Sequence, residues 1–200
     1  VYSDSNDSNI PEIQMKRILL AALLGGLVMF VWTSVNHMLL PTSEMGITSM
    51  PNEDPVLEAL RTNVPDAGMY YFPGFDMGAN MTPEQEAAWT QKHKTGPAGL
   101  LIYKPVGGEP MPPALLVTEF LSTIIAALFM ALIADRLSGA YMKRVLLLSL
   151  LGLFGWVSIS LSQWNWYSFP TAYFLADGID QYVGALVGAF LVAKLVPSRA

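Results

Sequence analysis

Four ionisable side chains near the ends of long apolar stretches are the residues best suited to chemistry in this chain. His37 lies near the end of the first stretch, Glu119 near the start of the second, and Asp177 and Asp180 in the last. Ionisable groups inside membrane helices are costly and usually face a bundle interior, water or a partner. An imidazole with three carboxylates can hold a divalent metal or relay protons. The spacing lacks an ExxH or HExxH pattern, however, so we predict no metal.

Three interpretations of Asp177 and Asp180 are open. In the first, which we expect, the last helix starts near Gly178 and the carboxylates stabilise its N-terminus through the helix dipole. An Asp-Gly pair is typical of such a start or of a break. In the second, a polar network ties the four helices together. In the third, the two carboxylates join His37 and Glu119 in a working site for a metal or a proton relay.

Long apolar stretches must position these residues. They cover Ile18–Leu40, Ala114–Ala134, Val145–Leu161 and Thr171–Val196. A hydrocarbon core of about 30 Å needs about 20 apolar residues in a helix, so each stretch is about long enough to cross a bilayer. The sequence therefore predicts an all-α membrane protein with four transmembrane helices, N-in and C-in, and a small mixed α/β extracytoplasmic domain between the first two.

The basic residues beside the helices set the predicted orientation. Lys16 and Arg17 precede the first helix, and the link between the second and third helices carries Arg136, Lys143 and Arg144. The positive-inside rule places these segments in the cytoplasm. The predicted boundaries are a flexible cytoplasmic tail at 1–16, transmembrane helices at 17–40, 114–134, 145–163 and 171–196, an extracytoplasmic domain at 41–113, a cytoplasmic link at 135–144, an extracytoplasmic turn at 164–170 and a cytoplasmic tail at 197–200.

The inserted segment has its own local signals. Thr82, Pro83 and Gln85 form a capping-box pattern, which predicts a helix running to about Lys94. Two short β-prone runs bounded by Gly and Pro predict an antiparallel ribbon of residues 69–72 with 100–103. We expect the aromatic residues of this segment to form its small core, with a position at the membrane interface as the alternative. These residues are Tyr70, Tyr71, Phe72, Phe75, Trp89 and Tyr103.

Small residues at helical spacing predict where helices approach one another, because lipid gives no hydrophobic drive between helices. The packing positions in the first and last helices are Ala21, Ala22, Gly25, Gly26, Gly184, Ala185, Gly188 and Ala189. We expect these two helices to pack against each other or against another protein's helix. Trp164, Trp166 and Tyr167 near the turn before the last helix predict an interfacial aromatic belt.

Composition excludes several classes of function. A formal charge of -5 argues against nucleic acid as a partner, and the absence of cysteine excludes thiol chemistry. The sequence has no Walker loop, no GxSxG and no dinucleotide fingerprint. We predict no cofactor. Contact with a lipid, a quinone or a pigment remains an alternative, with His37 as the single imidazole available inside an apolar stretch.

Several segments together resemble a family. They are Lys16-Arg17 with Leu20–Trp32, Pro51–Asp54, Phe72–Gly74, Gly96-Pro97 with Leu101–Tyr103, and Trp164–Trp166. The chain resembles a group of bacterial four-helix inner-membrane proteins of about this length, for which we know no activity or site residues. The resemblance implies a multi-pass protein of the bacterial inner membrane and nothing catalytic.

The absence of a catalytic pattern favours a non-catalytic role over an enzyme. We expect an accessory or assembly subunit of a larger membrane complex, respiratory or photosynthetic, with membrane lipid and a protein within the membrane as partners. The alternative is a small membrane enzyme or carrier that uses the carboxylates at the outer helix ends on a lipid-like or quinone-like ligand.

Overall fold

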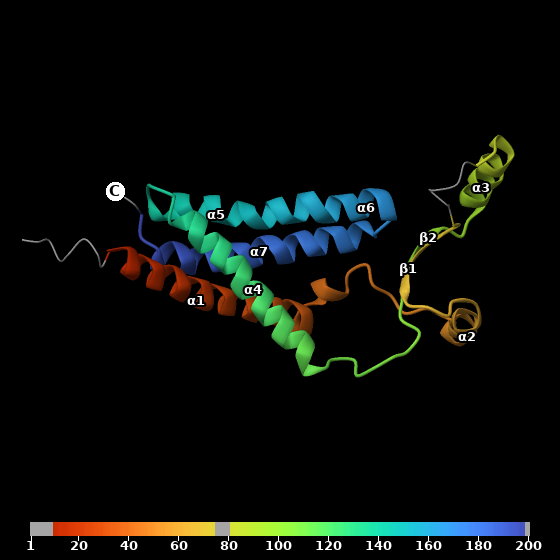
Figure 1. The fold of residues 1–200 in the computed structure, drawn as a ribbon, viewed down its shortest axis with the longest axis horizontal. Helices are drawn as coiled ribbons and strands as arrows, with labels where there is room; N and C mark the ends of the chain where they lie inside the picture. Colours follow the sequence, from red (N-terminus) through yellow and green to blue (C-terminus); the bar gives the residue numbers. More distant parts are fainter. Residues whose placement is uncertain (1–9, 75–80, 199–200) are drawn as a thin grey trace, which may run out of the picture. The chain divides into compact units, whose positions relative to one another are not determined.

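The computed structural model describes residues 10–74 and 81–198, and the chain divides into two compact units. The helical unit comprises Val1–Ile47, Met111–Ser162 and Pro170–Ala200, and the ribbon unit comprises Thr48–Pro110 and Gln163–Phe169. The elements of the helical unit are α1 (Ile10–Leu39), η1 (Pro41–Glu44), α4 (Pro113–Ala134), α5 (Tyr141–Gly155), the π-helical η2 (Trp156–Ser160) and α7 (Thr171–Leu195). Figure 1 shows α1, α4, α5 and α7 gathered into one bundle.

Four helical spans are long and apolar enough to cross a membrane. They are Glu12–Leu39, Pro113–Ala134, Tyr141–Tyr167 and Thr171–Leu195. Within the apolar 18-residue stretch of α7, 39% is buried inside the protein, compared with 22 to 28% in the corresponding stretches of the other three spans. The protein is therefore a mostly helical, multi-pass membrane protein with α7 as its most enclosed helix.

Three predicted boundaries differ from the structure. The first helix begins at Ile10, inside the predicted tail, and an ion pair of 2.6 Å between Lys16 and Glu12 supports this extra length. The third span begins at Tyr141, inside the predicted link. It continues through α6 (Leu161–Tyr167), inside the predicted turn at 164–170. Arg144, which we placed in the cytoplasmic link, supports the earlier start because its side chain finds hydrogen-bond partners within the bundle.

Arg144 joins the ends of three helices. Its side chain donates to the carbonyl oxygens of Ala134 at the end of α4 (3.1 Å) and of Ala193 (3.1 Å) and Val196 (2.6 Å) at the end of α7. The residue is only 3% exposed. The last carbonyls of a helix lack partners within the helix and carry partial negative charge, so a buried guanidinium stabilises them.

Small residues bring the helices close together. An added Cβ on Gly26 would lie 2.5 Å from the backbone Cα of Ile124, so α1 and α4 approach backbone to backbone there. An added Cβ on Gly25 would lie 2.8 Å from Val192 on α7, and one on Gly188 would lie 2.8 Å from Met29 on α1. Residues of both predicted packing faces thus lie at helix contacts, and α1 packs against α4 as well as against α7. Ala21, Ala22, Ala185 and Ala189 are buried.

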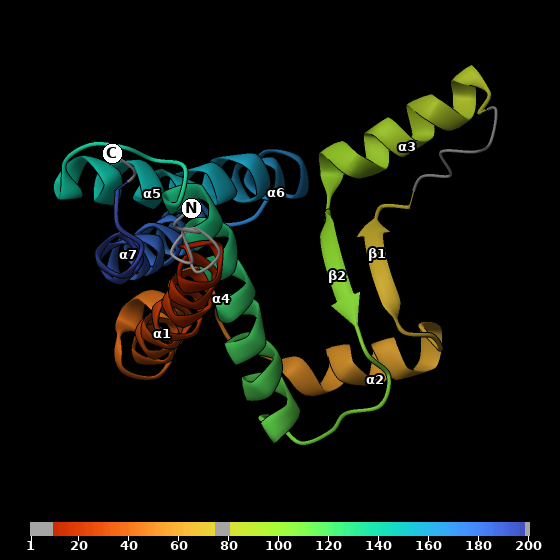
Figure 2. The same ribbon diagram turned by 60° about the vertical axis from the view of Figure 1, so that its left-hand side comes forward.

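The ribbon unit consists of two helices and a two-stranded sheet. Its elements are α2 (Glu53–Asn63), β1 (Gly68–Phe72), α3 (Pro83–Thr95) and β2 (Gly99–Tyr103). The strands are antiparallel, with Tyr70 opposite Leu101, which confirms the predicted ribbon. The capping box of Thr82 and Gln85 is also confirmed. Within this unit, Figure 2 shows α2 at one end of the ribbon and α3 at the other.

The ribbon unit has no buried core within the described residues 48–74 and 81–110, where every side chain is exposed or half-buried. The expectation that its aromatic residues form a core is therefore wrong for Tyr70, Tyr71, Phe72, Trp89 and Tyr103, while Phe75 lies outside the described residues. The physical reason is that a two-stranded sheet offers no second layer. Tyr71 and Trp89 contact His93 of α3, but this one helix leaves their rings exposed or half-buried.

Candidate functional site

The candidate site is built on α7, which is one continuous helix from Thr171. Our prediction of a helix start near Gly178 is wrong, because the helix begins after Pro170, whose carbonyl accepts from the amide of Phe174 (3.0 Å). Gly178 serves packing instead: an added Cβ there would lie 2.7 Å from the indole nitrogen of Trp156. Asp177 and Asp180 consequently lie inside a membrane span and cannot be explained as N-terminal caps.

Asp177 is held by two side chains. Ser160 of η2 donates its hydroxyl to Oδ2 of Asp177, and Gln181 donates to the same oxygen at 2.8 Å. Gln181 also lies 3.3 Å from the hydroxyl of Ser160. The three side chains form a network that joins the third span to α7. The π-helical turn that carries Ser160 is a type of distortion found most often at functional sites.

Asp180 has one partnered and one unpartnered carboxylate oxygen. Oδ2 lies 3.5 Å from Nε2 of His37 on α1, while Oδ1 is buried and has no hydrogen-bond partner among the described residues. Its side chain is 17% exposed, whereas that of His37 is 57% exposed. The backbone carbonyl of Asp180 accepts from the indole of Trp32 at 3.2 Å, which ties α7 to α1 a second time.

Asn36 and Thr42 complete the polar cluster, by which we mean Asn36, His37, Thr42, Ser160, Asp177, Asp180 and Gln181. The hydroxyl of Thr42 donates to the side-chain oxygen of Asn36, which is 2% exposed. This contact fixes the turn after α1. The polar cluster draws on α1, η1, η2 and α7 but not on α4, and its contacts form three groups: Asn36 with Thr42, His37 with Asp180, and Ser160 with Asp177 and Gln181. The second interpretation, one network that ties all four helices together, stays a prediction.

Two cavities of the helical unit, both partly open at the surface, have Asp180 in their linings. The smaller, of about 40 Å³, is lined by Asn36, His37, Thr42, Tyr173, Ala176, Asp177 and Asp180. The larger, of about 240 Å³, is lined by Met29, Thr33, Thr123, Ala126, Met130, Leu151, Gly152, Asp180, Gln181, Gly184 and Ala185. Asp180 is the residue common to both linings. A cavity of about 150 Å³ accommodates a benzene ring, so the larger space can hold a small organic molecule.

The four predicted site residues do not all come together. Glu119 is exposed on α4 and lines neither cavity, while His37, Asp177 and Asp180 line the smaller one. Among the residues that the structure describes, no three His, Asp or Glu side chains are placed to hold a metal ion. The metal form of the third interpretation, built from all four residues, is therefore not formed, while its proton-relay form stays a prediction. The rotation of α4 about its axis turns Glu119 away, and sequence spacing carries no information on that rotation.

The structure adds five residues to the predicted site: Trp32, Asn36, Thr42, Ser160 and Gln181. A signal was present for three of them, because Asn36, Ser160 and Gln181 are polar residues at the same end of apolar stretches as Asp177. The predicted aromatic belt lies on α6, where Trp164, Trp166 and Tyr167 are 38, 72 and 44% exposed.

Comparisons of the chain with protein-family models, curated proteins and solved structures find no match.

Proposed function

We propose that the chain is a non-catalytic integral protein of the bacterial inner membrane and an accessory or assembly subunit of a larger membrane complex, respiratory or photosynthetic. The observation that carries this proposal is the absence of any buried side chain in the described part of the ribbon unit. A small folded segment without a core gains little stability by itself, and a partner that covers its apolar side chains supplies the missing burial.

One face of the ribbon is suited to such a partner. Met69 and Ile102 lie directly opposite each other on β1 and β2 and are 65 and 71% exposed. Tyr71, two residues after Met69, lies on the same face and is 39% exposed. We call these three residues the ribbon face. Adjacent apolar side chains with this exposure are typical of a protein interaction site.

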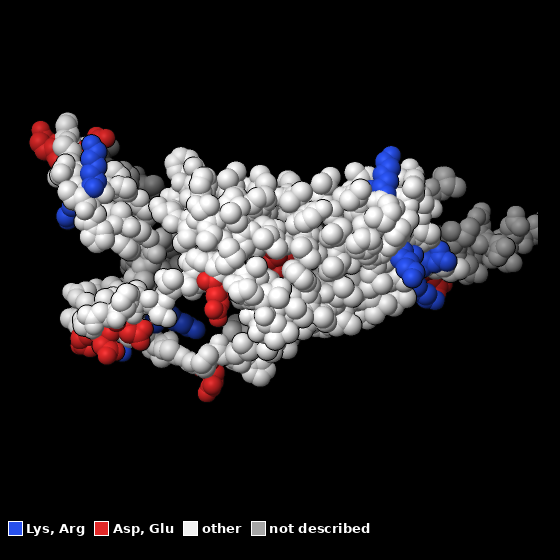
Figure 3. All heavy atoms as spheres, turned by 180° about the vertical axis from the view of Figure 1, so that it is seen from behind, with Lys and Arg blue, Asp and Glu red and all other residues white. Residues whose placement is uncertain are grey.

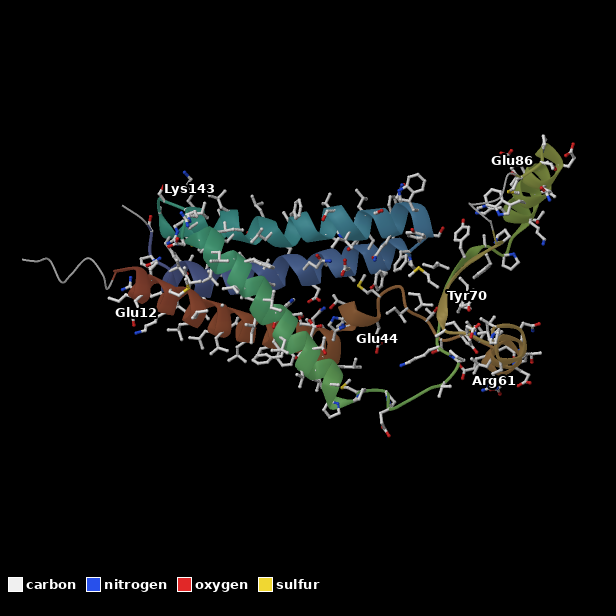
Figure 4. The ribbon with its side chains drawn as sticks, viewed as in Figure 1. Glu12, Glu44, Arg61, Tyr70, Glu86 and Lys143 are labelled. Carbon is white, nitrogen blue, oxygen red and sulfur yellow. The ribbon has the colours of Figure 1, made fainter. Side chains whose placement is uncertain are left out.

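The charge of the flanking helices indicates the chemistry of the partner. Acidic residues dominate the first turns of both helices of the ribbon unit. They are Glu53 and Asp54 in α2, and Glu84 and Glu86 in α3. Figure 4 labels Tyr70 on the ribbon and Glu86 on α3. A partner with an apolar strip and basic residues at its rim complements this surface, because opposite charges favour specific encounter.

The proposed orientation of the protein in the membrane is based on its basic residues. Figure 3 shows Lys and Arg side chains gathered at one end of the helical bundle. Figure 4 labels Lys143 and Glu12 at that same end of the bundle, on different helices. By the positive-inside rule this end faces the cytoplasm, and the segment between α1 and α4 faces the periplasm.

Photocrosslinking in the native membrane tests the proposal. A photoreactive amino acid at Ile102 should give one discrete adduct with a membrane protein that also copurifies in gentle detergent. The same group at Lys143, an exposed residue of α5 outside the ribbon unit, is the matched control and should give none. A monodisperse free protein without an adduct at position 102 contradicts an accessory role.

A second candidate function is favoured by one observation, the cavity of about 240 Å³ inside the helical unit. A small membrane enzyme or carrier for a lipid-like or quinone-like ligand would need such a space. This candidate predicts that the purified protein retains a small molecule and that no stoichiometric protein partner copurifies.

A further inference from the structure

The charges of the helical unit are divided between its two ends. The starts of α1 and α5 and the ends of α4 and α7 form one end of the bundle, where Figure 3 shows the Lys and Arg side chains. Six basic residues lie there, with only Glu12 and Asp135 as acidic neighbours among the described residues. The six are Lys16, Arg17, Arg136, Lys143, Arg144 and Lys194. The rest of the described helical unit has acidic residues but no Lys or Arg.

Contacts within the protein use three of these six positive charges. Lys16 pairs with Glu12 at 2.6 Å, and Arg136 pairs with the buried Asp135 at 3.4 Å. Arg144 is buried and donates to carbonyls at the helix ends. Both acidic residues of this end therefore already have a basic partner, and neither is left to neutralise the other three bases.

Arg17, Lys143 and Lys194 are exposed and have no ion-pair partner among the residues that the structure describes. We call these three residues the basic rim. They come from three different helices, α1, α5 and α7. Arg17 is the sixth residue of its membrane span, Lys143 the third and Lys194 the second to last. At a rise of 1.5 Å per residue, each lies within about 8 Å of the end of its helix, which is the depth of lipid headgroups.

We propose that the basic rim binds the headgroups of anionic phospholipids in the leaflet that surrounds this end of the bundle. The ammonium and guanidinium groups donate to phosphate oxygens, and such charge-assisted hydrogen bonds are strong. The long stems of Lys and Arg lie along apolar surface while their charged ends reach the interface. The inference goes beyond the accessory role and does not depend on it, because the basic rim includes no residue of the ribbon unit.

The surroundings of Lys194 suit a phospholipid. Tyr141 of α5 donates its hydroxyl to the carbonyl of Phe190 on α7 at 2.8 Å, and the centres of the two rings are 6.5 Å apart. The rings are 41 and 39% exposed. Lys194 follows Phe190 by four positions and therefore lies on the same face of α7. Aromatic rings beside a basic residue at a helix end are typical of the membrane interface.

Charge and position together select an anionic lipid. A zwitterionic headgroup carries a positive group beside its phosphate and therefore has no net charge to balance the basic rim. An anionic headgroup has that charge, and one Lys or Arg near such a surface favours it roughly fivefold in affinity. A soluble acidic partner would meet these bases poorly, because all three lie within the membrane spans and not in a segment that projects beyond them.

Lipid spin labels in reconstituted vesicles test the proposal. The full chain is placed in vesicles of phosphatidylcholine with trace phosphatidylglycerol or phosphatidylcholine, each carrying the same spin-labelled acyl chain. We expect the protein to restrict phosphatidylglycerol with an association constant roughly two- to fivefold that of phosphatidylcholine in 0.1 M salt. In 1 M salt the screening length falls from about 10 to about 3 Å, so this preference should fall below about 1.5-fold.

Two triple variants locate the effect. Combined Arg17→Gln, Lys143→Gln and Lys194→Gln should abolish the preference for phosphatidylglycerol. The matched control removes three exposed bases of the ribbon unit, through Lys92→Gln, Lys94→Gln and Lys104→Gln. It changes the net charge equally and should leave the preference intact. Lys194→Gln alone should remove part of the preference, and this variant keeps the test decisive if the first triple variant fails to fold.

Several results would overturn the lipid site. Equal restriction of the two lipids by the wild-type protein would show that the bases influence only the direction of insertion. A preference that survives 1 M salt, persists in the folded rim variant or is lost equally in the control would contradict the role of the basic rim. Inorganic phosphate at constant ionic strength should not displace the labelled lipid, and full displacement would assign the bases to a soluble anion instead.

Discussion

Replacement of Arg144 is the perturbation whose size the structure defines best. Three hydrogen bonds from its guanidinium, at 3.1, 3.1 and 2.6 Å, reach carbonyls at the ends of α4 and α7. A hydrogen bond from a charged group contributes roughly 1.5 to 3 kcal/mol, so three would contribute about 4.5 to 9 kcal/mol if each were lost completely. Methionine keeps most of the stem packing, and carbonyls at helix ends regain some contacts with water. We therefore expect Arg144→Met to lower the free energy of unfolding by about 3 to 5 kcal/mol.

Reversible unfolding in mixed micelles of a mild detergent and sodium dodecyl sulfate measures this change. Lys143→Met is the matched control, because it removes the same charge from the adjacent exposed position and should change stability by less than about 0.5 kcal/mol. Arg144→Lys keeps the charge but loses the planar fork, so an intermediate loss is expected. An Arg144→Met protein as stable as the wild type, or an equal loss in Lys143→Met, would refute the role of Arg144 at the helix ends.

Two further predictions concern helix contacts and the ribbon unit. Gly26→Ala should destabilise the bundle by about 1 to 3 kcal/mol, because its Cβ would meet the backbone of Ile124. Gly188→Ala meets only the flexible side chain of Met29 and should cost less in the same unfolding assay. Thr82→Ala removes half of the capping box and should destabilise α3 by about 1 kcal/mol, measured by amide hydrogen exchange. Hydrogen bonds from the Thr82 hydroxyl and from its own backbone amide lower the pKa of Glu84, so carboxyl NMR titration of Thr82→Ala should show that pKa rising towards its ordinary value.

Features with a local cause were predictable from the sequence. The four apolar spans follow from length and composition, the ribbon from two short β-prone runs, and the capping box of α3 from Thr82, Pro83 and Gln85. In each case a few neighbouring residues specify the element, because the periodicity or the cap acts over one or two turns.

Features set by contacts between distant segments were not predictable. An Asp-Gly pair normally favours a helix start, yet α7 continues through Gly178 because Trp156 packs where a side chain would stand. From the sequence, we expect Arg144 to belong to a cytoplasmic link. It is buried instead because its side chain donates to carbonyls that lie 10 to 52 positions away in the chain. Glu119 has the same chemistry as Asp180 but lies on an exposed face of α4. Which side of a helix faces the bundle decides whether such a residue is buried or exposed. That rotation of the helix about its axis depends on distant contacts and cannot be predicted from neighbouring residues.

The same comparison distinguishes two buried polar groups, those of Asp180 and Arg144. Each has one buried polar atom without a partner in the described part of the chain: Nε of Arg144 and Oδ1 of Asp180. Arg144 directs its other nitrogens to three carbonyls, and it lines neither of the two cavities, so its unpaired atom is a local cost of capping helix ends. Asp180 faces the exposed His37 at 3.5 Å, its backbone carbonyl accepts from Trp32, and it lines both cavities. An acidic side chain with one unpartnered oxygen is costly to keep in a membrane helix. Asp180, rather than Arg144, is therefore the buried group whose retention in a membrane helix its described contacts explain least.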